Sequence, residues 1–188
     1  KNDISDYVLI IPGDVPLLNK DNIGLLIEET QKKSAALGII TAEVSDPTGY
    51  GRIIRAGDTI AKIVEQADAS EEEQKIREVN SGMYCFNKKF LLETIENLDD
   101  NNNQNEIYLT DLIEIAFQNK LETVIVKVSE DTIKGVNSMS QLNDVEKTLR
   151  EKLINSHMEN GVYFQDTSTA FIDENVMIKA GARIMANT

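Results

Sequence analysis

The sequence has no tryptophan, a single cysteine, a single histidine and only three prolines. One cysteine cannot form a disulfide within the chain, and Cys85 lies in the apolar run Met83–Phe86, so we expect a buried, unreactive thiol and a reducing, cytoplasmic setting. His157 has no neighbouring cluster of histidine or cysteine, so we expect it at the surface. No apolar run is long enough to span a membrane, and we expect no membrane span. With no disulfide and no membrane span expected, we expect a globular protein whose fold is stabilised by its apolar core.

Basic residues are also scarce, because nineteen Lys and Arg stand against thirty-two Asp and Glu, a net charge of −13. They are scattered along the chain, so we expect no nucleic acid as a partner. The same charge suits a bound nucleoside triphosphate poorly unless the basic part of that site lies elsewhere. The sequence starts at Lys1 with neither an initiator methionine nor a signal peptide, and we expect an internal fragment of a longer protein.

The apolar run Val8–Ile11 ends at a turn that carries Asp14. The run predicts a strand covered on both faces in a parallel sheet, and Pro12, Gly13 and Pro16 prevent its continuation. Ligands of open α/β sheets bind just beyond the carboxyl ends of strands, where a carboxylate can hold Mg²⁺ together with water and substrate phosphate. The alternative is that Asp14 only closes the turn by accepting bonds from nearby backbone N–H groups.

A helix and a second strand follow this turn. Asn19 or Asp21 is predicted to cap a helix that ends at about Lys33, and residues 36–44 predict another buried strand. A strand–helix–strand order with short connections implies a right-handed crossover, so we expect a parallel sheet. The loop Asp46–Arg52 contains two glycines that let a ligand approach the main chain closely; the alternative is a flexible surface turn.

Three later segments place polar side chains at the ends of predicted elements. Residues 53–65 predict a hairpin whose last residue is Glu65. The strand predicted over residues 78–86 is interrupted by an Asn-Ser-Gly sequence, which indicates a bulge or a close backbone approach and makes Asn80 a candidate ligand contact. Thr110, or a residue just before it, is predicted to cap the amphipathic helix that follows.

The last part of the chain has different periodicities. Residues 138–160 carry apolar side chains at spacings of three and four, which predicts a helix on a domain surface or between two domains. Ile172, Ile178 and Ile184 each open a repeat of six residues. Hexapeptide repeats are typical of a β-helix, and this number of them makes about one coil.

The order and spacing of these features resemble a family of bacterial bifunctional enzymes, the N-acetylglucosamine-1-phosphate uridyltransferases and glucosamine-1-phosphate N-acetyltransferases. The matching segments are Gly13–Leu18, Asp46–Ile53, Ile63–Glu65, Val79–Gly82, Glu106–Asp111 and Gly135–Asn137, followed by the hexads. The resemblance runs from about residue 8 to residue 184 and implies an α/β fold. The implied parts are a Rossmann-like nucleotidyltransferase sheet that is incomplete at its start (residues 1–137), a connecting helix (138–160) and the first coil of a left-handed β-helix (161–188).

The resemblance also implies a reaction and the residues that serve it. The phosphate of N-acetylglucosamine 1-phosphate would attack the α-phosphorus of UTP in line, giving UDP-N-acetylglucosamine and pyrophosphate, a chemistry that needs positioning and charge neutralisation but no protein nucleophile. Asp14 and Asn137 would be the protein ligands of a catalytic Mg²⁺. The sugar would be contacted by Gly51, Glu65, Asn80 and Asn137, with Gly13 and Asp14 close to the nucleotide and Thr110 near the sugar pocket.

Two departures from the family pattern bear on what this chain does. The family's glycine-rich nucleotide loop would precede Lys1, and most of the β-helix, with its acetyl-CoA site, would follow Thr188. We therefore expect no uridyl transfer by the isolated chain and assign it no acetyl transfer, while the intact parent is expected to be a homotrimer that also uses acetyl-CoA. Pro12 has no N–H, so any main-chain contact at that turn must come from Gly13 or Asp14.

Two alternatives remain open at this point. The chain could belong to a related nucleotidyltransferase that acts on glucose 1-phosphate, although the segments around Glu65 and Asn80 match the acetamido-sugar form. It could also be a regulatory or assembly subunit that keeps the fold without catalysis, in which case Asp14 and Asn137 would have no need to hold Mg²⁺.

Overall fold

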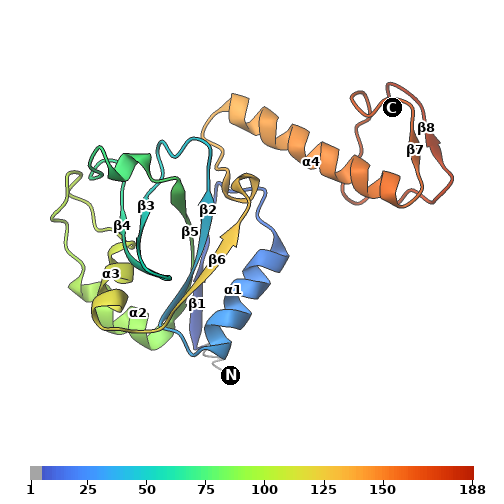
Figure 1. The fold of residues 1–188 in the computed structure, drawn as a ribbon. Coiled ribbons are helices and arrows are strands. Elements are labelled where there is room, and N and C mark those ends of the chain that lie inside the picture. The colour runs from blue at the N-terminus through green and yellow to red at the C-terminus, as the bar shows by residue number, and fades with distance from the viewer. Residues whose placement is uncertain (1–5) are drawn as a thin grey trace. The chain divides into compact units, whose positions relative to one another are not determined.

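The computed structural model describes residues 6–188 of the chain, which divide into two compact units. The first unit ends at Lys134 and the second runs from Gly135 to Thr188. The first five residues of the predicted nucleotidyltransferase domain lie outside the described range. Figure 1 shows the first unit as a sheet with helices on both sides, and the second as the long helix α4 followed by the short strands β7 and β8.

The first unit contains six strands, three α-helices and three short 3₁₀ turns within the described residues. The strands are β1 (Tyr7–Ile10), β2 (Leu37–Glu43), β3 (Arg52–Ala56), β4 (Thr59–Val64), β5 (Glu78–Asn87) and β6 (Thr123–Val128). The helices are α1 (Lys20–Lys32), α2 (Lys88–Thr94) and α3 (Asp111–Gln118), and the 3₁₀ turns are η1 (Glu73–Lys75), η2 (Ile95–Asn97) and η3 (Glu130–Ile133).

The six strands form one mixed sheet around β5. Its order is β4-β3-β5-β2-β6, and β1 also pairs with β5. Strands β1 and β2 are both antiparallel to β5, so they run in the same direction but are separated by it. The predicted parallel sheet is therefore wrong for this pair, and the parallel pairing within the described sheet is between β2 and β6.

The prediction that β1 is covered on both faces is also wrong. Leu9 is 37% exposed and Ile11, just after the strand, is 39% exposed. Among the described residues, β1 pairs with β5 alone, so it lies at an edge of the sheet, where fewer neighbours can cover it. An apolar run of four residues does not by itself distinguish a central strand from an edge strand.

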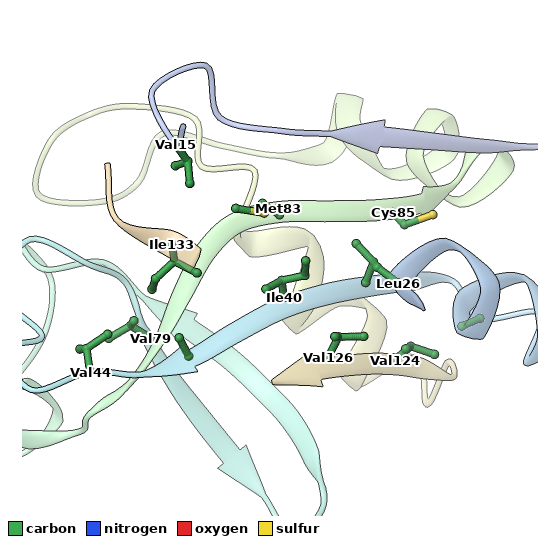
Figure 2. Packing of buried hydrophobic residues seen from close by; sticks show 12 residues of the cluster. Val15, Leu26, Ile40, Val44, Val79, Met83, Cys85, Val124, Val126 and Ile133 are labelled. Carbon is green, nitrogen blue, oxygen red and sulfur yellow. The ribbon is translucent and has the colours of Figure 1, made fainter. Parts of the chain in front are cut away.

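Each face of the sheet carries its own apolar cluster. The α1 face buries Leu26, Ile40, Met83, Cys85 and Val126, which Figure 2 shows gathered between α1 and the sheet. Cys85 is 1% exposed, as predicted for a buried thiol. The opposite face packs residues of the β3–β4 hairpin and helices α2 and α3 against β2 and β5; its buried members include Leu37, Ile39, Ile53, Ile60, Tyr84, Phe86, Phe90, Leu112 and Ile113.

Local predictions hold where short-range chemistry decides them. Asn19 caps α1, and its side-chain oxygen accepts a bond of 2.8 Å from the backbone N–H of Asp21. The predicted bulge is present in β5, because Tyr84 pairs with Ile39 whereas Asn80 pairs with Thr41, so β5 has more residues between these pairs than β2. The predicted cap of α3 is only partly right, since Thr110 occupies the cap position but its side chain makes no capping bond.

The second unit begins with a long helix and ends in the hexads. Helix α4 (Met139–Glu159) starts at Ser138, whose hydroxyl accepts a bond of 3.2 Å from the backbone N–H of Gln141. Strands β7 (Tyr163–Phe164) and β8 (Arg183–Ile184) pair in parallel. The three hexad-leading isoleucines, Ile172, Ile178 and Ile184, pack against the buried cluster of Ile154, Val162, Phe164 and Ala170. A parallel return of this kind is compatible with a β-helix, and the left-handed β-helix stays a prediction. Within residues 6–188, no helix is both long and apolar enough to cross a membrane.

Candidate functional site

Asp14 lies on an exposed turn immediately after β1. The alternative role predicted for it, closing the turn by accepting backbone N–H groups, is not observed, because no hydrogen bond or ion pair engages its carboxylate among the described residues. An exposed, unengaged carboxylate fits Mg²⁺, which is commonly held by one or two protein carboxylates, with water and substrate phosphate completing its shell. Residues 6–188 contain no group of three or more His, Cys, Asp or Glu suited to a metal, so this turn would supply few ligands.

The turn of Asp14 is anchored to the core by the residue that follows it. Val15 is buried in the same cluster as Met83 and Ile133, and Figure 2 shows the three side chains at one end of that cluster. Tyr50 packs against this cluster, and burial raises the pKa of its hydroxyl, with smaller contributions from the nearby carboxylates, Asp14 among them. The glycine-containing loop and the Asp14 turn are therefore neighbours.

The loop Asp46–Arg52 is exposed at Thr48 and Gly49, and hydrogen bonds join it to Gln66. Arg52 is 1% exposed, donates 2.7 Å from Nη2 to Gln66 Oε1 and donates from Nη1 to the carbonyl of Tyr50. The backbone N–H of Gly49 donates to the same Gln66 oxygen over 3.1 Å. Burial lowers the pKa of Arg52, although at neutral pH a guanidinium stays charged. Both glycines of this loop thus come just before a buried cation that bonds to the loop backbone.

The structure brings together four residues that the sequence predicts at the sugar. The backbone N–H of Asn80 donates to the Gly51 carbonyl over 2.9 Å, and the Thr110 hydroxyl donates to Glu65 Oε1 over 3.1 Å. A Cβ atom on Gly51 would lie 3.1 Å from Glu65 Oε2, so the missing side chain leaves the carboxylate room beside the main chain. These contacts join Gly51, Glu65, Asn80 and Thr110 into one continuous group on the first unit.

Glu65 is a half-buried carboxylate with unused acceptor capacity. Burial raises its pKa, the bond from Thr110 opposes that rise, and Asp111 and Asp68 add to it. Thr110 is its one hydrogen-bond donor among the described residues, whereas an ionised carboxylate accepts about four bonds. A ligand that brings hydroxyl groups would satisfy the remaining oxygen lone pairs.

A cavity of about 320 Å³ opens beside Glu65. Tyr108, Asp68 and Asp111 are among the residues that line it, and its other charged groups are mostly carboxylates. Carboxylates accept bonds from hydroxyls but repel phosphate, so the cavity suits an uncharged, hydroxyl-rich group. Two larger cavities, of about 590 and 460 Å³, contain none of the predicted site residues.

Asn137, the other predicted Mg²⁺ ligand, belongs to the second unit, where it is exposed just before α4. Its backbone N–H donates to Gln141 Oε1 over 2.7 Å. Its role as a ligand stays a prediction, and so do the contacts of Gly13 with a nucleotide.

Sequence reasoning missed two buried polar groups near this site. Arg52 is the last residue of the glycine-containing loop and could be recognised only as part of a matched segment. Tyr84 lies in the apolar run Met83–Phe86, where an aromatic residue predicts core packing. Tyr84 is 3% exposed, and its hydroxyl has no hydrogen-bond partner among the described residues. Nothing in the local sequence distinguishes this hydroxyl from an ordinary buried tyrosine.

Comparison with known proteins places these observations in a family. Residues 1–167 match the family described as nucleotidyl transferase. The chain is 42% identical over 178 residues to the protein of Acetivibrio thermocellus named Bifunctional protein GlmU, covering 94% of this chain and 39% of that protein. It is 43% identical over 188 residues to the protein of the same name from Clostridium botulinum strain 657, covering 96% and 41%. The chain thus spans about two fifths of the length of these relatives.

Solved structures support the fold of the chain. A crystal structure assigned as a UDP-N-acetylglucosamine pyrophosphorylase of Entamoeba histolytica superposes with a TM-score of 0.66 at 15% identity, covering 97% of this chain and 56% of that one. One assigned as a glucose-1-phosphate thymidylyltransferase of Bacillus anthracis superposes with a TM-score of 0.58 at 18% identity, covering 78% and 55%. At such identities the likeness establishes the Rossmann-like fold of the sheet and its helices, and nothing about substrate.

Proposed function

The chain belongs to the nucleotidyl transferase family, and from this premise we propose that it carries the sugar-phosphate part of a uridylyltransferase site. The proposed reaction joins UTP and N-acetylglucosamine 1-phosphate to give UDP-N-acetylglucosamine and pyrophosphate. The observation that carries the proposal is the contact group of Gly51, Glu65, Asn80 and Thr110 beside an acid-lined cavity. The identity to proteins named GlmU and the segment resemblance give it further support.

Each residue has a role that its surroundings allow. Glu65 would accept bonds from sugar hydroxyls, and Asn80 would donate from its amide nitrogen, because its Oδ1 already accepts the Gly82 N–H over 2.9 Å. Asp14 would hold Mg²⁺, which when bound neutralises charge on the triphosphate. The chain would align the sugar-phosphate oxygen with the α-phosphorus of UTP, so that the new P–O bond forms opposite the departing pyrophosphate.

The proposal is best tested in a chimera, in which residues 1–188 replace the matching part of the Clostridium botulinum relative. Pyrophosphate release is measured from UTP with N-acetylglucosamine 1-phosphate or glucose 1-phosphate, with and without Mg²⁺. We expect Mg²⁺-dependent turnover with the acetamido sugar, and we expect Asp14→Ala to lower kcat on the order of a hundredfold or more without changing the melting temperature. Asp58→Ala, at an exposed hairpin turn, is the matched control and is expected to retain activity.

The possible outcomes separate the competing functions. Turnover with glucose 1-phosphate alone would contradict the acetamido-sugar assignment. A folded chimera that is inert with both sugars would favour the assembly subunit. The activity of the isolated chain, its oligomeric state and any acetyl transfer by the whole protein stay predictions, and residues 6–188 are assigned no acetyl-CoA site.

A further inference from the structure

Tyr84 presents a buried hydroxyl that the fold itself does not use. Its side chain is 3% exposed, and the hydroxyl oxygen has no hydrogen-bond partner within residues 6–188. Buried polar groups in native proteins are nearly always paired, because an unpaired one loses its bonds to water without replacement. A phenylalanine would fill the same space without that loss, so the hydroxyl calls for a role other than packing.

The bulge of β5 brings Tyr84 and Asn80 to the same place. Asn80 pairs with Thr41, and Tyr84 pairs with Ile39. Thr41 and Ile39 are two residues apart on β2, so their side chains point to one face of the sheet, and the side chains of their partners on β5 point to the same face. In a regular strand, residues four apart would be about 13 Å from each other. The extra residues in the bulge shorten that separation, so both side chains lie on the face that carries α2 and α3.

The neighbours of the hydroxyl come from the proposed sugar site. Burial raises the pKa of Tyr84, Asn80 lies close enough to oppose that rise, and the Glu65 carboxylate adds to it. The hydroxyl therefore stays protonated and can donate at any physiological pH. The ring cannot turn away easily, since it packs against Phe86 with centroids 5.4 Å apart at an interplanar angle of 35°.

Asn80 has an accessible amide that can respond to a ligand. The residue is only partly buried, its Oδ1 accepts the Gly82 N–H over 2.9 Å, and its amide N–H groups lie close enough to the Tyr84 oxygen to oppose the rise in the Tyr84 pKa. A small shift of this amide would bring one Nδ2–H within hydrogen-bond distance of the Tyr84 hydroxyl oxygen. With the Gly82 N–H on its Oδ1 and one of its own N–H groups on Tyr84, the amide is fixed in orientation, and its second N–H is left for a ligand.

We propose that Tyr84 is a positioning residue for the sugar, whose hydroxyl oxygen accepts one N–H of the Asn80 amide while the other N–H of that amide binds an oxygen of the sugar. Tyr84 acts through Asn80 and is too enclosed to touch the sugar itself. This inference rests on the proposed function, because it names a second group that serves the same sugar site. It predicts that the hydroxyl strengthens binding of the sugar phosphate and contributes nothing to the stability of the free protein.

Tyr84→Phe, Asn80→Ala and the double variant test the proposal, in the 188-residue chain for thermal stability and in the chimera for kinetics. We expect Tyr84→Phe to melt at the same or a higher temperature than the parent. We also expect it to raise KM for N-acetylglucosamine 1-phosphate about three- to tenfold, the range of one neutral hydrogen bond, with KM for UTP unchanged. In the Asn80→Ala background, Tyr84→Phe should have no further effect, because the two residues act as a unit. Tyr163→Phe, which removes a half-exposed hydroxyl of the second unit, is the matched control.

Each other outcome contradicts the inference in a different way. Additive effects of Tyr84→Phe and Asn80→Ala would mean that Tyr84 contacts the sugar independently. An unchanged KM, or a lower melting temperature with both KM values changed, would leave Tyr84 a packing residue. An unmodified chimera that turns over neither sugar phosphate contradicts the proposed function and this inference with it, whereas an active one with an unaffected Tyr84→Phe variant contradicts this inference alone.

Discussion

Gly82, in the bulge of β5, lies directly against Pro12, at the start of the turn that carries Asp14. A Cβ atom on Gly82 would be 3.0 Å from Pro12 Cγ. The two residues continue the antiparallel register of β1 and β5 beyond Ile10 and Tyr84, and Pro12 ends the ladder because it has no N–H to donate. Through Gly82, whose N–H binds Asn80, the bulge of the proposed sugar site and the proposed metal turn are in contact.

Gly82→Ala is expected to impair activity more than stability. Gly82 has φ of +76°, which costs an alanine on the order of 1–2 kcal/mol, and the added methyl group would also push against Pro12. We expect kcat in the chimera to fall at least about tenfold, since small displacements of reacting groups have large effects on rate. Urea unfolding and pyrophosphate release measure the two effects.

Gly57→Ala separates backbone strain from the contact with Pro12. Gly57 has φ of +63° in the β3–β4 turn, and a Cβ atom there would meet nothing within 4 Å. The Gly57→Ala variant should lose about as much stability as the Gly82→Ala variant while keeping its activity. Equal losses of activity in both variants would show that the Pro12 contact has no part in the effect.

Gly51→Ala is expected to weaken sugar-phosphate binding. The new Cβ atom would lie 2.9 Å from Ile63 Cγ2 and within 3.2 Å of both Glu65 oxygens, so the carboxylate or the strand has to move. We expect a higher KM for the sugar phosphate, an unchanged KM for UTP and a stability loss of about 1–3 kcal/mol from overcrowding. Steady-state kinetics with each substrate varied in turn distinguish this result from a general loss of folded enzyme, which would lower kcat and leave both KM values alone.

Glu65→Gln is expected to stabilise the fold at neutral pH while weakening sugar binding. Burial raises the folded-state pKa of Glu65 above 4.5, so the ionised side chain opposes folding at pH 7 and this opposition fades as the pH falls through the folded pKa toward 4.5. Urea unfolding should therefore show Glu65→Gln more stable than the parent at pH 7 and equal to it near pH 4. Loss of the charged acceptor should weaken sugar-phosphate binding on the order of tenfold to a hundredfold.

Glu78→Gln should behave in the opposite way and serves as the control. Burial opposes its ionisation, but hydrogen bonds from Arg55 and Thr41 outweigh that effect and lower its pKa. A lowered folded-state pKa contributes stability above about pH 4.5 that is lost as the pH falls through the folded value. Glu78→Gln should be less stable than the parent at pH 7, with the difference shrinking below pH 4.5. The same pH trend for both variants would contradict these assignments.

Two glycines that pack differently should respond oppositely to alanine. A Cβ atom on Gly38 of β2 would collide with Thr30 Oγ1 and lie 2.8 Å from Leu26 Cδ1, so α1 would have to move, at a cost of about 1–3 kcal/mol. Gly24 is exposed within α1, where a Cβ atom would meet nothing within 4 Å, and alanine should stabilise the helix by about 1 kcal/mol. Urea unfolding of the two variants checks both signs, and destabilisation by Gly24→Ala would contradict the α1 packing.

Much of the local structure around the candidate site was predictable, because its residues occur next to strong local signals. The prolines around Asp14 predict a turn at the end of an apolar strand, and the Asn-Ser-Gly sequence predicts the bulge that holds Asn80. Thr110 was harder to place, because its position before α3 indicates a cap, whereas in the fold Glu65 competes for its hydroxyl and binds it. That competition involves a residue distant in sequence, which no local pattern records.

The sequence by itself determined the local conformations: the strands, the caps at Asn19 and Ser138, the bulge at Gly82 and the six-residue spacing of the isoleucines. These follow from backbone sterics and side-chain periodicity, which act over a few residues. Only the tertiary structure decided that β5 lies between β1 and β2, which makes the sheet mixed, exposes Leu9 and places Gly82 against Pro12. It also decided that the Tyr84 hydroxyl is buried beside Asn80, with no hydrogen bond of ordinary length to any group of residues 6–188. Strand pairing and burial depend on contacts between residues far apart in the chain. Periodicity along the chain does not indicate which strands will pair.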